Sequence, residues 1–157
     1  MKNKIRLTIY IFVSGFFLCL DQVLKFWARG NQEFSFYIWK NWLGWEYFEN
    51  AGIAFSFPFP NWLIIILTPI ILLGFLYFVT KKKRPFGVSS GQLHTIFYLG
   101  IFLIFAGAIS NFIDRVLFGV TIDYLRVLTG VINLADVMIV VGAGVVLLRC
   151  GDKEIRI

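Results

Sequence analysis

The chain has 157 residues, of which 59% are hydrophobic and only 15% are charged. In soluble domains about 45–50% of residues are apolar and about 25% are charged. A small globule has too much surface for its volume to bury a larger share of apolar residues. A mean hydropathy of +0.78 therefore excludes a soluble globule and a disordered chain, and favours an integral membrane protein.

Four apolar segments approach the length of about 20 residues that a membrane-spanning helix needs. They cover residues 7–28, 62–79, 93–113 and 131–148. No repeat or composition boundary divides the chain, so we expect a single membrane domain over residues 1–157.

The basic residues predict how these helices are oriented. They gather before the first segment, at residues 81–84 between the second and third, and after the fourth. In a soluble protein the net charge of +6 would suggest nucleic acid as a partner. Here the positive-inside rule explains it better, so we expect no nucleic-acid partner and place both termini in the cytoplasm. Most acidic residues then fall on the opposite, extracytoplasmic side.

The first outer connection, residues 30–61, is long and rich in aromatic residues. Apolar and polar positions alternate over residues 34–39 and 43–48, which predicts two short strands with a turn near Asn41. The second outer connection, residues 114–130, contains Gly119 and Gly130 as breakers and is expected to be a loop. The predicted fold class is an all-α integral membrane protein with four transmembrane helices and a small extracytoplasmic β-sheet between helices one and two.

Ionisable residues at membrane depth are costly, so each is a candidate functional residue. Asp21 and Lys25 form an i, i+4 pair, which is either a self-neutralising ion pair or a group that orients a neighbouring site. Asn50 and Gly52 favour a turn with positive φ, and small residues there would also let a substrate backbone approach.

A second set of polar residues lies at the outer ends of the third and fourth segments. Asn111, Asp114 and Arg115 share one helix face, which exceeds what a helix cap requires. Asn133 and Asp136 have the spacing of a capping box at the start of the fourth helix.

Asp123 and Asp136 are close enough in sequence to meet at the same end of the bundle. Two neighbouring carboxylates do not both ionise easily, so one holds a proton while the other is charged. Aspartic proteolysis needs that state, because one group activates water and the other protonates the substrate.

Five motifs in order resemble those of the lipoprotein signal peptidases, also called signal peptidase II. They are Asp21-Gln-x-x-Lys25, Asn50-x-Gly52-x-Ala54-Phe55, Gly107-Ala108-x-x-Asn111-x-x-Asp114-Arg115, Ile122-Asp123-Tyr124 and Asn133-x-Ala135-Asp136. The resemblance implies an aspartic endopeptidase of the bacterial inner membrane. Such an enzyme removes the signal peptide from diacylglyceryl-modified prolipoproteins by cutting before the lipidated cysteine.

The resemblance also implies roles for particular residues. The catalytic pair would be Asp123 and Asp136. Substrate-binding residues would be Asn50, Gly52, Asn111, Arg115 and Asn133, with Asp21, Lys25 and Asp114 in support. The family's outer β-cradle would correspond to residues 30–50.

The sequence departs from the family's usual pattern in two places. Ser110 stands where Gly is usual, and residues 121–124 replace the usual Val-Val-Asp-Phe. The single His94 has no His or Cys cluster around it, so we expect no metal, and no organic cofactor is implied. The partners expected are the lipidated precursors and the bilayer, with the chain as a monomer.

Two other classes of protein remain open. A small transporter or proton-coupled carrier would use membrane acids as relays, which should then run across the bilayer. A structural membrane subunit would not need Asn, Asp and Arg side chains gathered on one face.

The predicted orientation can be tested with reporter fusions. Fusions at Gly87 and after Ile157 should report a cytoplasmic location, and fusions at Trp42 and Phe118 an extracytoplasmic one. A cytoplasmic signal at Phe118 would put the acidic residues on the wrong side of the membrane.

Overall fold

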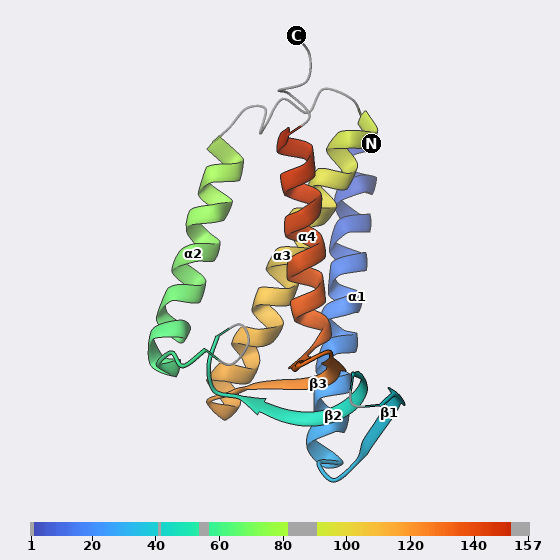
Figure 1. Cartoon of the computed structure of the whole chain (residues 1–157). Helices are drawn as coiled ribbons and strands as arrows, with labels where there is room; N and C mark the ends of the chain where they lie inside the picture. Colours follow the sequence, from blue (N-terminus) through green and yellow to red (C-terminus); the bar gives the residue numbers. More distant parts are fainter. Residues whose placement is uncertain (1, 41, 54–56, 82–90, 152–157) are drawn as a thin grey trace.

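The computed structural model describes residues 2–40, 42–53, 57–81 and 91–151. The predicted turn at Asn41, the motif residues Ala54 and Phe55, and residues 82–90 and 152–157 lie outside the described residues. The described residues form helices that run side by side and an antiparallel sheet that lies across one end of them (Figure 1).

Each predicted span contains a helix, but the fourth helix begins at Leu134 rather than at residue 131, because residues 131 and 132 belong to a strand. Helix α1 covers Lys2–Gly30, α2 covers Asn61–Lys81, α3 covers Gly91–Phe118 and α4 covers Leu134–Gly151. Among the described residues, three stretches are long and apolar enough to cross a membrane: Ile5–Gly30, Asn61–Phe78 and Thr95–Phe118. The apolar stretch of α4, Leu134–Leu148, is shorter, so the fourth crossing stays a prediction.

Helix α3 is longer than predicted. We expected it to end at Ile113, but it continues to Phe118, so Asp114 and Arg115 are helical rather than loop residues. Gly119 then ends the helix with a φ of +78°, a conformation that glycine adopts without strain. Its N–H donates to the carbonyl oxygen of Arg115 at 3.1 Å.

The sheet is larger than predicted. Strands β1 (Ser35–Trp39) and β2 (Leu43–Asn50) confirm the expected pair, but β3 (Thr121–Val127) and β4 (Gly130–Ile132) come from the second connection. The strand order is β1-β2-β3-β4, and all neighbours are antiparallel. The prediction of a sheet confined to the connection between helices one and two was therefore wrong, as was the reading of residues 114–130 as a loop.

The missed strand β3 has a physical reason. Its first four residues, Thr121 to Tyr124, are all buried, and the strand lies between β2 and β4 and contacts helices α1 and α3. Thr121 to Tyr124 do alternate polar and apolar side chains, but the breakers Gly119 and Gly130 on either side led to the prediction of a loop.

Aromatic packing attaches the sheet to α1. Ala28 of α1 is buried with Ile122 and Tyr124 of β3, and Trp45 of β2 stacks on the Tyr124 ring with centroids 4.7 Å apart. This cluster fixes the position of β3 against the helices.

The outer faces of the helices are apolar and exposed. Phe12, Phe26 and Ile71 are 74%, 80% and 64% exposed, and α2 has no buried residue among those described. Such surfaces suit a hydrocarbon environment, where association depends on close packing rather than on burial from water.

Helices α3 and α4 approach closely at glycines. A Cβ built on Gly142 would lie 2.5 Å from the carbonyl oxygen of Gly100, and one on Gly107 would lie 2.5 Å from that of Ala135. Real contacts are never this short, so only glycine allows the two helices to pack here.

We expect Gly142→Ala to lower the thermal unfolding midpoint in detergent by several degrees. Overpacking costs about 1–3 kcal/mol, which exceeds the gain of about 1 kcal/mol in helix propensity. Gly144→Ala is the matched control, since a Cβ on Gly144 meets nothing within 4 Å. Equal midpoints for the two variants would contradict the close approach.

Candidate active site

The sheet lies against one end of α1, α3 and α4 (Figure 1). The predicted site residues contact one another in this region. Most of these residues have ionisable or amide side chains, and most are nevertheless buried. The buried members are Asp21, Lys25, Asn50, Gly52, Asp114, Arg115, Asp123 and Asn133.

The predicted capping box is present at the start of α4. The backbone N–H of Asp136 donates to Asn133 Oδ1 at 2.9 Å, and the N–H of Asn133 donates to Asp136 Oδ2 at 3.3 Å. This reciprocal pair fixes the Asp136 carboxylate at the N-terminus of the helix, where the peptide dipoles favour a negative charge.

Two asparagine amides connect Asp123 to Asp136. Asn133 Nδ2 donates to Asp123 Oδ1 at 2.6 Å and to Asn111 Oδ1 at 3.1 Å. Asn111 Nδ2 donates in turn to Asp136 Oδ1 at 2.8 Å. The two carboxylates therefore lie in one hydrogen-bonded network, as their spacing in the sequence predicted.

Asp123 lies on β3 and has no exposed surface. Burial is the largest cause that raises the pKa of Asp123 to about 7, and the negative charge of Asp136 adds to it. Hydrogen bonds from Asn50, at 3.1 Å, and from Asn133 act in the opposite direction. A carboxyl group with this pKa can hold or release a proton near neutral pH.

Lys25 lies between two buried carboxylates. Its Nζ is 3.0 Å from Asp21 Oδ2 and 2.8 Å from Asp114 Oδ2, and it donates to Asn111 Oδ1 at 2.8 Å. The predicted Asp21–Lys25 ion pair is therefore present, and through Asn111 it also contacts the network that includes Asp136.

Arg115 binds the chain that follows β2. Its Nη2 donates to the Gly52 carbonyl oxygen at 2.5 Å, and its Nη1 donates to Asn61 Oδ1 at 3.4 Å. The N–H of Gly52 donates to Asn50 Oδ1 at 3.0 Å, which confirms a turn. The expected positive φ is wrong, because among the described residues it occurs at Lys40, Leu128 and Gly119.

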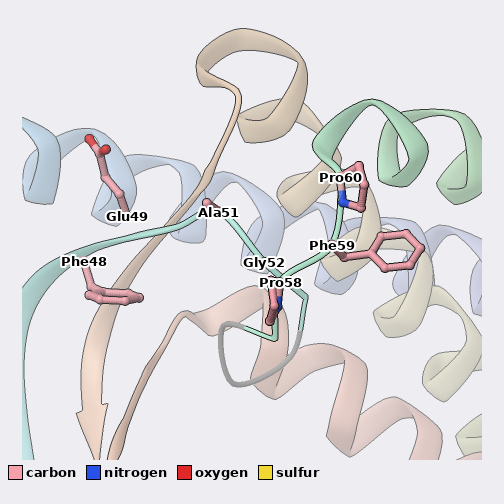
Figure 2. A pocket seen from close by; sticks show the side chains of 7 residues that line it. All are labelled: Phe48, Glu49, Ala51, Gly52, Pro58, Phe59 and Pro60. Atoms are coloured by element: carbon pink, nitrogen blue, oxygen red, sulfur yellow. The ribbon is translucent and has the colours of Figure 1, made fainter.

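An open hollow of about 520 Å³ adjoins this turn, along the segment between β2 and α2 (Figure 2). Apolar residues dominate its lining, which consists of Phe48, Glu49, Ala51, Gly52, Pro58, Phe59 and Pro60. Gly52 thus belongs both to the hollow and to the hydrogen-bonded network of Arg115.

Four residues of the network were not among the predicted site residues. Gln22 Nε2 donates to Ser110 Oγ at 2.8 Å and to Asp114 Oδ1 at 3.3 Å. The Tyr124 hydroxyl donates to Asp21 Oδ1 at 2.8 Å, and Asn61 Nδ2 donates to the Arg115 carbonyl oxygen at 3.3 Å. Gln22 could have been found as a polar residue within an apolar span, whereas Asn61 had no signal of its own.

The described residues contain no group of three His, Cys, Asp or Glu side chains arranged to hold a metal ion.

With this geometry in view, comparison with known proteins identifies the class. Residues 13–150 match the model of the family described as Signal peptidase (SPase) II, and the chain belongs to that family of membrane peptidases.

Individual relatives agree with the family assignment. The chain is 34% identical over 145 residues to a lipoprotein signal peptidase of Lactococcus lactis, covering 88% of this chain and 89% of that one. It is 34% identical over 140 residues to the lipoprotein signal peptidase of Clostridioides difficile, covering 85% and 88%. A solved bacterial membrane enzyme is 25% identical and superposes with a TM-score of 0.76 over 96% of this chain and 94% of that one.

The raised pKa of Asp123 gives a prediction about stability. The folded protein holds the proton on Asp123 up to about pH 7, whereas the unfolded chain releases it at about pH 4. Rising pH should therefore destabilise the wild type between these two values. Asp123→Asn has no such proton to lose. Between about pH 4 and pH 8, its unfolding midpoint should therefore shift upward relative to the wild type by several degrees.

The measurement is thermal unfolding in detergent across this pH range. Glu33→Gln, which neutralises an exposed carboxylate, should follow the wild type. Parallel curves for the wild type and Asp123→Asn would contradict the raised pKa.

Proposed function

We propose that the chain is an aspartic endopeptidase that removes signal peptides from diacylglyceryl-modified prolipoproteins, cutting before the lipidated cysteine. Membership of the signal peptidase II family supports the substrate class. The observation that carries the mechanism is the pair of carboxylates, Asp123 and Asp136, joined through Asn133 and Asn111.

In this mechanism the two carboxylates divide the proton transfers. Asp136, which accepts hydrogen bonds from Asn111 and from the first turn of α4, is the ionised member and takes a proton from the attacking water. Asp123, whose pKa is raised to about 7, is the protonated member and gives its proton to the carbonyl oxygen. The tetrahedral intermediate then collapses, and the leaving amine takes a proton from the dyad.

Substrate binding is assigned to Asn50, Gly52, Asn111, Arg115 and Asn133. Arg115 and Asn50 shape the turn at Gly52 beside the apolar hollow, where a precursor backbone can lie. Asn111 and Asn133 use their amide groups on the dyad itself, so their part in binding includes orienting the two carboxylates.

The supporting residues are Asp21, Lys25 and Asp114. Their ion pairs join α1 to α3, and the N–H of Ile122 donates to Asp114 Oδ2 at 3.1 Å, which joins β3 to the same cluster. They hold the elements that bear the dyad and take no part in proton transfer.

The proposed setting is the bacterial inner membrane. Four helices cross it, both termini lie in the cytoplasm, and the sheet and dyad face the extracytoplasmic side, where lipidated precursors emerge. The positive-inside distribution of basic residues supports this orientation.

The position of the acidic side chains argues against a proton-coupled carrier. In the described helices, Asp21, Asp114 and Asp136 all bind one network at the sheet end, through Lys25 and Asn111. A relay would instead need acids spaced along the bundle.

The proposed activity is tested with purified protein and two forms of one precursor, lipidated and unlipidated. The lipidated form should be cut before the modified cysteine and the unlipidated form should not. Asp123→Asn and Asp136→Asn should each reduce turnover by at least about 10²-fold with substrate binding nearly intact, because Asn keeps the shape but cannot transfer the proton.

The double variant should be scarcely slower than either single variant, since the two residues act as one unit. Glu46→Gln, on the sheet but outside the network of the dyad, is the matched control and should keep wild-type turnover. Substantial cleavage by either single variant would remove Asp123 and Asp136 as the catalytic pair.

A further inference from the structure

Three side chains accept hydrogen bonds from the backbone N–H groups at the start of α4. The first turn of a helix leaves its N–H groups without partners in the helix. Here Leu134 N–H donates to the Tyr124 hydroxyl at 3.1 Å, Ala135 N–H to Asp21 Oδ1 at 3.2 Å, and Asp136 N–H to Asn133 at 2.9 Å. The first of these is unusual, because the acceptor is a tyrosine on a strand.

The Tyr124 hydroxyl is held from both sides. It donates to Asp21 Oδ1 at 2.8 Å while it accepts the bond from Leu134 N–H. The residue has no exposed surface, and its ring is stacked on Trp45. The hydroxyl therefore has one available position, between α1 and the first residue of α4.

This position connects the two elements that bear the dyad. Tyr124 follows Asp123 on β3, and its side chain points to the opposite face of the strand because successive residues alternate. Leu134 lies two residues before Asp136 on α4. A single hydroxyl thus joins the strand of one carboxylate to the helix of the other, independently of the asparagine amides.

We propose that Tyr124 is a positioning residue, whose hydroxyl sets the placement of Asp136 relative to Asp123. The proposal rests on the proposed function in that these carboxylates are taken to be the catalytic pair. The hydroxyl does not touch the reacting atoms. It acts through the first turn of α4, where a displacement of about 1 Å can reduce turnover by about 10²-fold.

The test compares three variants in cleavage of a lipidated precursor. Tyr124→Phe removes the hydroxyl and keeps the stacked ring. It should lower kcat by about 10- to 100-fold with KM within about twofold of wild type. Ser110→Ala removes another donor to Asp21, at 2.6 Å, without touching α4, and should cause a much smaller loss.

Tyr47→Phe is the matched control. Its hydroxyl also binds a carboxylate, Glu49 at 2.6 Å, on the same sheet, but it has no bond to α4. It should keep the wild-type kcat. Equal losses of kcat in Tyr124→Phe and Ser110→Ala would overturn the proposal, as would wild-type kcat in Tyr124→Phe.

A second measurement does not depend on activity. Hydrogen exchange on the folded, monodisperse protein should show that the Leu134 and Ala135 amides exchange at least about tenfold faster in Tyr124→Phe than in wild type or Tyr47→Phe. If these amides exchange faster in Tyr124→Phe but the wild type cleaves no precursor, the hydrogen bond between Tyr124 and α4 is supported and the proposed function is rejected. Unchanged exchange, or a Tyr124→Phe protein with no folded fraction, would overturn the positioning role.

Discussion

Lys25 brings one positive charge into contact with two carboxylates, Asp21 at 3.0 Å and Asp114 at 2.8 Å, where almost no solvent reaches them. Removing one partner of such a buried pair costs about 3–5 kcal/mol, because it leaves an uncompensated charge. The two carboxylates also accept hydrogen bonds from uncharged donors. These donors are Gln22, Ser110, Tyr124 and the N–H groups of Ile122 and Ala135. The ion cluster therefore holds α1, α3, α4 and the sheet together.

The same lysine determines which way the amide of Asn111 faces. Because the ammonium group can only donate, Asn111 must present its oxygen to Lys25 and its nitrogen to Asp136. The oxygen also accepts from Asn133, whose amide group then reaches Asp123. The buried Lys25 thus orders a chain of hydrogen bonds that ends on Asp123 and Asp136, although Lys25 contacts neither of these two carboxylates.

Much of this arrangement follows from sequence, because apolar runs give the helices and the spacing at Asn133 and Asp136 gives the helix cap. The short separation of Asp123 and Asp136 in the sequence likewise predicts that they meet at one end of the bundle. Apart from Lys25, the partners of Asp21 could not be predicted from the sequence. Ser110 and Tyr124 looked like mild departures from a family pattern, yet both donate to that carboxylate from 89 and 103 residues away. No local periodicity encodes such contacts.

Helix α2 differs from the other helices in how it packs against the rest of the protein. It packs on α3 through Phe75 and Phe105, whose ring centroids are 5.9 Å apart, and Asn61 at its start bonds Arg115. None of the described side chains of α2 is fully buried, and Pro60, directly before the helix, lines the hollow beside Gly52. The surrounding amphiphile is therefore a structural component of the protein on this side. A detergent whose tails are too short to cover α2 would disturb the Arg115–Gly52 turn before it loosened the ion cluster, so reconstitution in lipid discs is the better state for measuring the enzyme.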